Sequence, residues 1–252
     1  MKKILCAIIL GGLVSTALST PFPSKSGQVA SAVSIGDVLQ AHNVPKKSHT
    51  LSEWAADAVR VRYYPVDSGR GLPGFFERNV SVSVSGGAFR RDKTDPLGLR
   101  KEIDMFDGRG AYHTTIEEGA QVEGAEMGDS GRLAVESAVR AFGLIPTLKQ
   151  LSDPAVNVVY IGQATGMLDR FDIRTADRPW TVYADRTHLI RRLDFEAATI
   201  EFADYRSVDG VQLPFFERLS ANGRLVYELV FTRIDLKPSF PRTCFDREAL
   251  AK

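Results

Sequence analysis

The C-terminal third of the chain most constrains the fold, because it reads as a series of short strands joined by tight turns. Asp209-Gly210 and Asn222-Gly223 each separate two β-type runs, and such pairs favour two-residue hairpins because both residues tolerate positive φ. No helical pattern intervenes, so we expect an antiparallel meander. The predicted strands, rich in Val, Ile, Phe, Tyr and Thr, cover 180–184, 189–195, 199–205, 211–217 and 225–234.

Apolar residues of two of these strands form a candidate ligand site. The 225–234 run is apolar on both faces, since Val226 and Val230 alternate with larger apolar residues. A strand covered on one side only alternates apolar with polar, so the second face is expected to meet helices, a ligand or both. The alternative is that both faces are covered by the rest of the domain. The candidate cavity residues are Trp180, Val182, Leu225, Tyr227, Leu229 and Phe231.

The front part of the chain predicts helices and further strands. Ser34 to Asp37 resembles a capping box and predicts a short helix, and a second box at 50–53 predicts a helical turn at 54–56. Period-two patterns then predict strands at 59–64, 79–85, 89–92, 99–106 and 111–116. Helical spacing predicts helices at 129–142 and 145–151. One antiparallel sheet of about ten strands would curl, with the helices on its concave side.

The N-terminus has the form of a secretory signal. A basic start, Met1-Lys2-Lys3, precedes an apolar run at 4–18 and small residues suited to cleavage. We expect a signal peptide at 1–19 and a linker at 20–33, with retention as a membrane anchor as the alternative. Cys6 lies inside the signal, so Cys244 would be the only cysteine of the mature chain. This excludes a disulfide framework and a cysteine-rich metal site.

Charge and histidine spacing narrow the function classes. The formal net charge of +1 offers no basic excess for phosphate contacts, so nucleic acid is not an expected partner. The four histidines are scattered, without the i, i+4 pair of a zinc hydrolase, and the glycines form no phosphate-cradling loop. We therefore expect no metal and no cofactor.

Two patterns that could suggest catalysis have simpler interpretations. Residues 128–131, Gly-Asp-Ser-Gly, match the short signature around a trypsin-like nucleophile, but the histidine context and the following residues do not fit. We interpret Asp129 and Ser130 as caps of the helix that begins there. The acids Asp169, Asp172 and Asp194 alternate with arginines, and we expect cross-strand ion pairs on a solvated face instead of a glycosidase pair. We therefore expect no catalytic residue.

Two stretches of the meander resemble a known bacterial class. They are the 180–185 strand, which ends in Asp185, and the 204–214 segment, in which Asp209-Gly210-Val211 leads to Pro214; a Phe-containing tail follows at 233–245. These features resemble the periplasmic outer-membrane lipoprotein-sorting proteins, similar to the Lol-system lipoprotein carriers, over about 155–246. No residue here matches the carriers' lipid-gating arginine.

The resemblance implies an α+β fold in which a curved antiparallel sheet forms an incomplete β-barrel, a half-barrel, covered by short helices. It would make 34–252 a single half-barrel domain with an apolar cavity for acyl chains. The expected function is a secreted, periplasmic, non-enzymatic binding protein or carrier for a lipid, a lipoprotein acyl chain or a similar apolar ligand, with envelope proteins as a second class of partner. The alternatives are a secreted hydrolase on the same sheet and a ligand-free envelope interaction protein.

Overall fold

The structure of the protein is a computed structural model that describes residues 33–44, 51–63, 75–140, 142–175 and 179–250. The predicted signal peptide and nearly all of the linker lie outside these residues. From Val33 onward the chain forms one compact unit. The division into signal peptide, linker and single domain stays a prediction.

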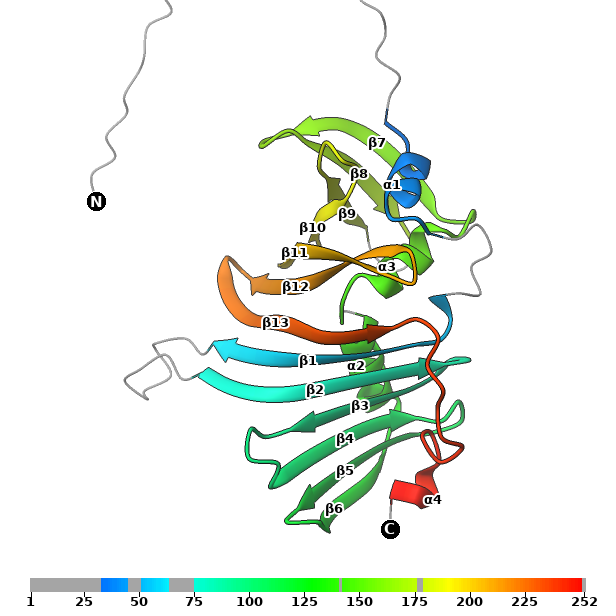
Figure 1. The fold of residues 1–252 in the computed structure, drawn as a ribbon, viewed down its shortest axis with the longest axis vertical. Helices are drawn as coiled ribbons and strands as arrows, with labels where there is room; N and C mark the ends of the chain where they lie inside the picture. Colours follow the sequence, from blue (N-terminus) through cyan, green and yellow to red (C-terminus); the bar gives the residue numbers. More distant parts are fainter. Residues whose placement is uncertain (1–32, 45–50, 64–74, 141, 176–178, 251–252) are drawn as a thin grey trace, which may run out of the picture. The chain divides into compact units, whose positions relative to one another are not determined.

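The described part of the chain forms a 13-stranded antiparallel sheet. The strands are β1 (Trp54–Tyr63), β2 (Phe75–Ser85), β3 (Ala88–Thr94), β4 (Arg100–Phe106), β5 (Ala111–Glu117), β6 (Ala120–Met127), β7 (Asn157–Ala164), β8 (Leu168–Arg174), β9 (Trp180–Ala184), β10 (Ile190–Asp194), β11 (Ala198–Val208), β12 (Val211–Ala221) and β13 (Arg224–Asp235). Their order is β6-β5-β4-β3-β2-β1-β13-β12-β11-β10-β9-β8-β7, so pairing of β1 with β13 joins two meanders (Figure 1). The predicted antiparallel meander is confirmed.

Two of the predicted hairpin turns have the expected backbone. Asp209 and Gly210 have φ of 49° and 86°, and Asn222 and Gly223 have φ of 49° and 73°. Positive φ at both central residues is the geometry that Asp-Gly and Asn-Gly pairs favour, and it matches the twist of the flanking strands. These turns fix the pairing of β11 with β12 and of β12 with β13.

The helices are few and short. They are α1 (Ile35–Ala41), α2 (Asp129–Arg140), α3 (Ile145–Leu151) and α4 (Arg247–Leu250). The box before α1 is confirmed, since the Ser34 side chain accepts from the Asp37 N–H and the Asp37 carboxylate accepts from the Ser34 N–H. The helical turn predicted at 54–56 is wrong, because Trp54 opens β1, where it is buried against the sheet core. Asp129 and Ser130 lie inside the first turn of α2 instead of capping it.

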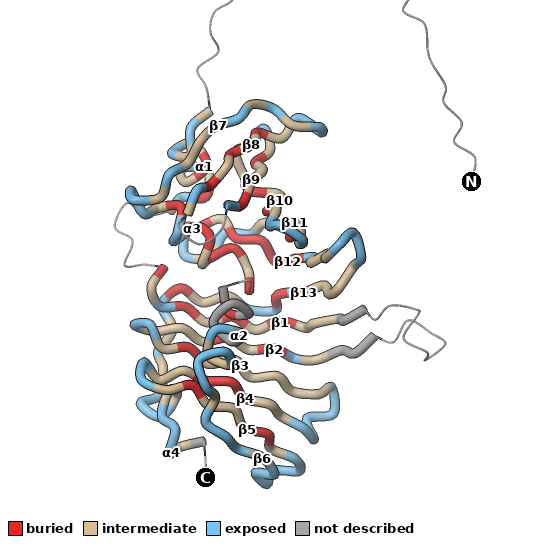
Figure 2. The backbone as a smooth tube through the Cα atoms, turned by 180° about the vertical axis from the view of Figure 1, so that it is seen from behind, coloured by how far each residue is buried: buried red, intermediate tan, exposed pale blue. Residues whose placement is uncertain are grey.

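Alternate strand residues face α2 and α3, and we call this side of the sheet the helix face and the other the far face. Cross-strand register places Trp54, Val84 and Phe89 together on the helix face. Buried segments recur along the strands and around α3 (Figure 2). Val230, in contrast, is 47% exposed on the far face, so the expectation of two covered apolar faces fails there. The strand is one-sided because its far face has no helix over it in the described residues.

Candidate ligand-binding face

The segment between α2 and α3 packs on the centre of the sheet, and α2 itself lies over β3 to β6. Phe142, just after α2, meets Phe231 of β13 edge to face, with ring centroids 5.2 Å apart. Between the two helices Gly143 has a φ of 78°, and a Cβ there would lie 3.4 Å from Phe231. Glycine therefore allows both the turn and the close approach to the sheet.

The structure brings most of the predicted site residues into one core. Trp180, Val182, Leu229 and Phe231 are at most 8% exposed and belong to the same buried cluster as Phe142 and the α3 residues, with Tyr227 packed against it. Leu225 is half-buried and lies beside a register shift between β12 and β13. The proposed ligand role of these residues stays a prediction.

Glu217 of β12 is a functional candidate that the sequence reasoning missed. It is fully buried, its Oε2 accepts from the Gly143 N–H at 2.8 Å, and its Oε1 lies 3.0 Å from the Tyr227 hydroxyl. Burial raises the pKa of Glu217 to about 8, and the two hydrogen bonds only partly oppose this. Its place in an alternating run with Val211 and Leu213 is the signal that could have found it.

His42, at the end of α1, is buried against β10 and β12. Its Nδ1–H donates to the Gln212 carbonyl at 2.7 Å, and its Nε2 accepts from the Ile190 N–H at 3.0 Å. Burial lowers the pKa of His42 to about 4, so the ring is neutral at physiological pH. Both ring nitrogens are used by backbone groups, and His42 therefore fixes α1 to the sheet instead of serving chemistry.

A second part of the helix face is charged. It lies on β2 to β5, and we call it the charged strip: Arg78, Arg91, Lys93, Glu102, Asp104 and His113. Asp104 is 4% exposed and accepts from Arg91 at 2.7 Å, from Lys93 at 3.2 Å and from His113 Nδ1 at 2.8 Å. Burial alone would raise the pKa of Asp104, but Arg91, Lys93 and His113 outweigh it and hold the pKa below its ordinary value.

The far face of the C-terminal strands carries ion pairs between arginine and aspartate. Arg170 pairs with Asp172 at 3.0 Å and Arg192 with Asp194 at 2.6 Å, both on partly exposed side chains. These two acids confirm the solvated-face interpretation, but each pair lies within one strand, β8 or β10, so the prediction of cross-strand pairs is wrong. For Asp169 the solvated-face interpretation is wrong, because this residue is buried on the helix face and accepts a hydrogen bond from the Tyr160 hydroxyl at 3.0 Å.

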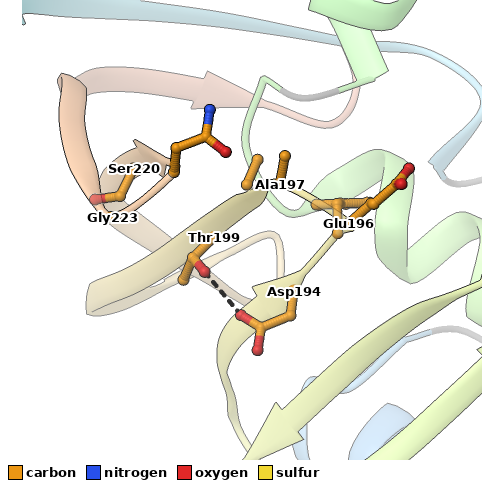
Figure 3. A pocket seen from close by; sticks show the side chains of 9 residues that line it. Asp194, Glu196, Ala197, Thr199, Ser220 and Gly223 are labelled. Carbon is orange, nitrogen blue, oxygen red and sulfur yellow. Dashed lines mark hydrogen bonds between the residues drawn. The ribbon is translucent and has the colours of Figure 1, made fainter. Parts of the chain in front are cut away.

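A surface pocket of about 340 Å³ lies at the turns between β10 and β11 and between β12 and β13. Its lining is largely polar, and Figure 3 shows Thr199 donating to Asp194 at its edge. It contains none of the six predicted site residues.

The protease-like signature gains no partner from the described residues. Ser130 is exposed, whereas His42 is committed to backbone groups and His113 to Asp104. The same residues contain no group of three or more His, Cys, Asp or Glu placed to hold a metal ion. No helix among them is long and apolar enough to cross a membrane.

Comparison with known proteins shows the fold. No family model and no curated protein matches the sequence. A LolA superfamily protein from Nitrosomonas europaea has a similar structure, with a TM-score of 0.55 and 12% identity over 86% of this chain and 99% of the other. A DUF1329 family protein from Desulfovibrio piger has a TM-score of 0.54 and 10% sequence identity, over 86% of this chain and 98% of the other. MucB in complex with MucA gives a TM-score of 0.18 and carries no argument. The resemblance to lipoprotein-sorting proteins is confirmed at the level of fold.

Proposed function

We propose that the protein is an exported, periplasmic, non-enzymatic carrier that binds an acyl chain or a similar apolar ligand on the helix face. The sheet would curve around the ligand as a half-barrel. The apolar ligand is the first partner, and envelope proteins that deliver or receive it are the second. The likeness in fold to a LolA superfamily protein supports this proposal.

The observation that carries the proposal is a large apolar sheet face covered only by short helices. α1 and α3 have 7 residues each and α2 has 12. Helices of this length gain little stability of their own and are held by packing, so local opening costs less than unfolding the sheet. Movement of α2, α3 and the segment between them would separate Phe142 from Phe231 and expose an aromatic surface suited to an acyl chain.

The engagement of the buried ionisable groups supports a role without chemistry. His42 and Glu217 are fully buried and bonded to backbone N–H or C=O groups, so neither can reach a substrate while the fold is intact. A hydrolase would need such a group at an accessible position.

A binding assay with matched variants tests the proposal. Fluorescent fatty acid should bind the purified mature protein, and native mass spectrometry should detect co-purified lipid. Leu225→Glu, at a half-buried candidate site residue, should weaken probe binding more than it lowers urea stability, whereas Val230→Glu, at an exposed far-face position of the same strand, should leave binding unchanged. A wild-type protein that neither binds the probe nor carries lipid would refute the proposal.

A further inference from the structure

The charged strip directly adjoins the apolar part of the helix face. In the β2–β3 register, Lys93 lies opposite Val80 and Arg91 opposite Val82, and both valines are at most 2% exposed. Adjacent strands are separated by about 4.8 Å. One step in the sheet therefore leads from buried aliphatic side chains to cationic ones.

The strip has a surplus of positive charge. Its cations are Arg78, Arg91 and Lys93, and its carboxylates are Glu102 and Asp104, so these five groups carry a net charge of +1.

The strip also keeps donor capacity and contact with solvent. Arg91 spends two of the five N–H groups of a guanidinium on Asp104. The Arg78 side chain, 3.1 Å from Glu102, is 29% exposed, and that of Arg91 is 17% exposed. A head group arriving from solvent can reach these donors. Its chain would lie along Val80, Val82 and Leu229 once the helices move away, since all three side chains are at most 2% exposed.

We infer that the ligand is an anionic amphiphile whose carboxylate or phosphate head group binds Arg78, Arg91 and Lys93 of the charged strip. This inference rests on the proposed function and specifies its substrate class. Charge-assisted hydrogen bonds from guanidinium to carboxylate or phosphate are strong and oriented, so they would fix the head group while the apolar face holds the chain.

Paired acidic and neutral lipids test the inference on the full mature chain. The probe is cis-parinaric acid, compared with its methyl ester, and lysophosphatidic acid and monoolein compete as phosphate and neutral lipids. The acid should bind about tenfold more tightly than the ester, as one charge-assisted hydrogen bond predicts. Raising the salt concentration should weaken binding of the acid but not of the ester, because salt screens only contacts between charges. The affinity of lysophosphatidic acid relative to that of the fatty-acid probe shows whether phosphate or carboxylate is the preferred head group.

Variants separate a binding role from a structural one. Arg78→Gln and Arg91→Gln should remove most of the difference between acid and ester, while Arg170→Gln, in an ion pair on the far face, should leave it intact. Since loss of Arg91 disturbs buried Asp104, the more exposed Arg78 and the salt response of the wild type carry the test if Arg91→Gln does not fold. Equal affinity for acid and ester overturns the inference and leaves the carrier proposal standing. The inference is also overturned if Arg78→Gln lowers the affinities for acid and ester equally and lowers stability as well. Absence of binding by all four lipids refutes both.

Discussion

Burial affects the charge of ionisable groups differently beside β10 to β12 and on β3 to β5. His42 and Glu217 lie in apolar surroundings with few counter-charges. Burial lowers the pKa of His42 and raises that of Glu217, and both shifts favour the neutral form. Asp104 is almost as deeply buried, yet Arg91 and Lys93 keep it ionised. The difference shows that partners, more than depth, decide the charge state in this sheet. In one part of the helix face the buried ionisable groups are therefore neutral, which suits the proposed acyl chain. In the other part they are ionised, which suits the inferred anionic head group.

The largest expected effect is at the centre of the apolar part. Phe231→Ala should lower the free energy of unfolding by about 3–5 kcal/mol, because the ring is buried against Phe142 and leaves a cavity. Phe195→Ala, at a ring that is 41% exposed, is the matched control and should cost far less. Urea denaturation measures both. Similar costs would show that Phe142, between α2 and α3, is not packed on β13.

Glu217→Gln should remove an alkaline loss of stability. The folded pKa of about 8 lies above the ordinary value of 4.5, so the folded state binds more protons and wild-type stability falls as pH rises from 4.5 through 8. At pH 9 the glutamine variant should exceed the wild type by about 3 kcal/mol. Denaturation across this range checks it, and parallel profiles would place Glu217 in contact with water.

His42 should produce the opposite slope on the acid side. Its folded pKa of about 4 lies below the ordinary 6.5, so its stabilising effect is complete above pH 6.5 and is lost as pH falls toward 4. The expected loss is up to about 3 kcal/mol. His42→Gln should flatten this part of the stability profile. A slope that persists in the variant would assign it to other groups.

Asp104→Asn should show how much the ion pairs of the charged strip contribute to the free energy of unfolding. The change leaves Arg91 and Lys93 close together without the buried carboxylate between them, at a cost of about 2 kcal/mol. Asp172→Asn, in a partly exposed pair with Arg170 on the far face, should cost less than about 1 kcal/mol. Equal shifts of the urea midpoint would erase the distinction between the two faces.

The smallest effect tests a turn outside both parts. Gly210 has a φ of 86°, where a β-branched residue is strained, so Gly210→Val should cost at least about 1 kcal/mol. Thermal melting detects this, and Gly210→Asn, which tolerates positive φ, is the control. An unchanged melting temperature for the valine variant would contradict the turn geometry.

Local sequence signals predicted the hairpins and helices but not the whole sheet. Asp-Gly and Asn-Gly turns, period-two runs and the box at Ser34 depend on neighbouring residues only, and the structure has them. The strands β6, β7 and β8 were missed. Gly124 and Gly162 interrupt two of them, and buried Asp169 hides the alternation of the third. The curvature of the whole sheet depends on how all strands twist together, so no local pattern specifies it, and the half-barrel stays a prediction.

The candidate site was predicted only in its apolar part. Trp180, Val182, Leu229 and Phe231 follow from alternation within single strands, and they share a core. The charged strip combines residues from four strands, and its pairs form only once the register of β2 to β5 is fixed. A lysine or arginine in an alternating run reads as solvated until that register is known.

Residue-level photo-crosslinking tests most directly whether the helix face binds an acyl chain. A fatty acid carrying a diazirine near its terminal methyl group is bound to the mature protein, irradiated and mapped by mass spectrometry. We expect labels at Tyr227, Phe231 and Phe142, and little label at Val230 on the far face. Labelling at Val230 equal to that at Phe231, or no label that excess unlabelled fatty acid displaces, would contradict a ligand site on the helix face.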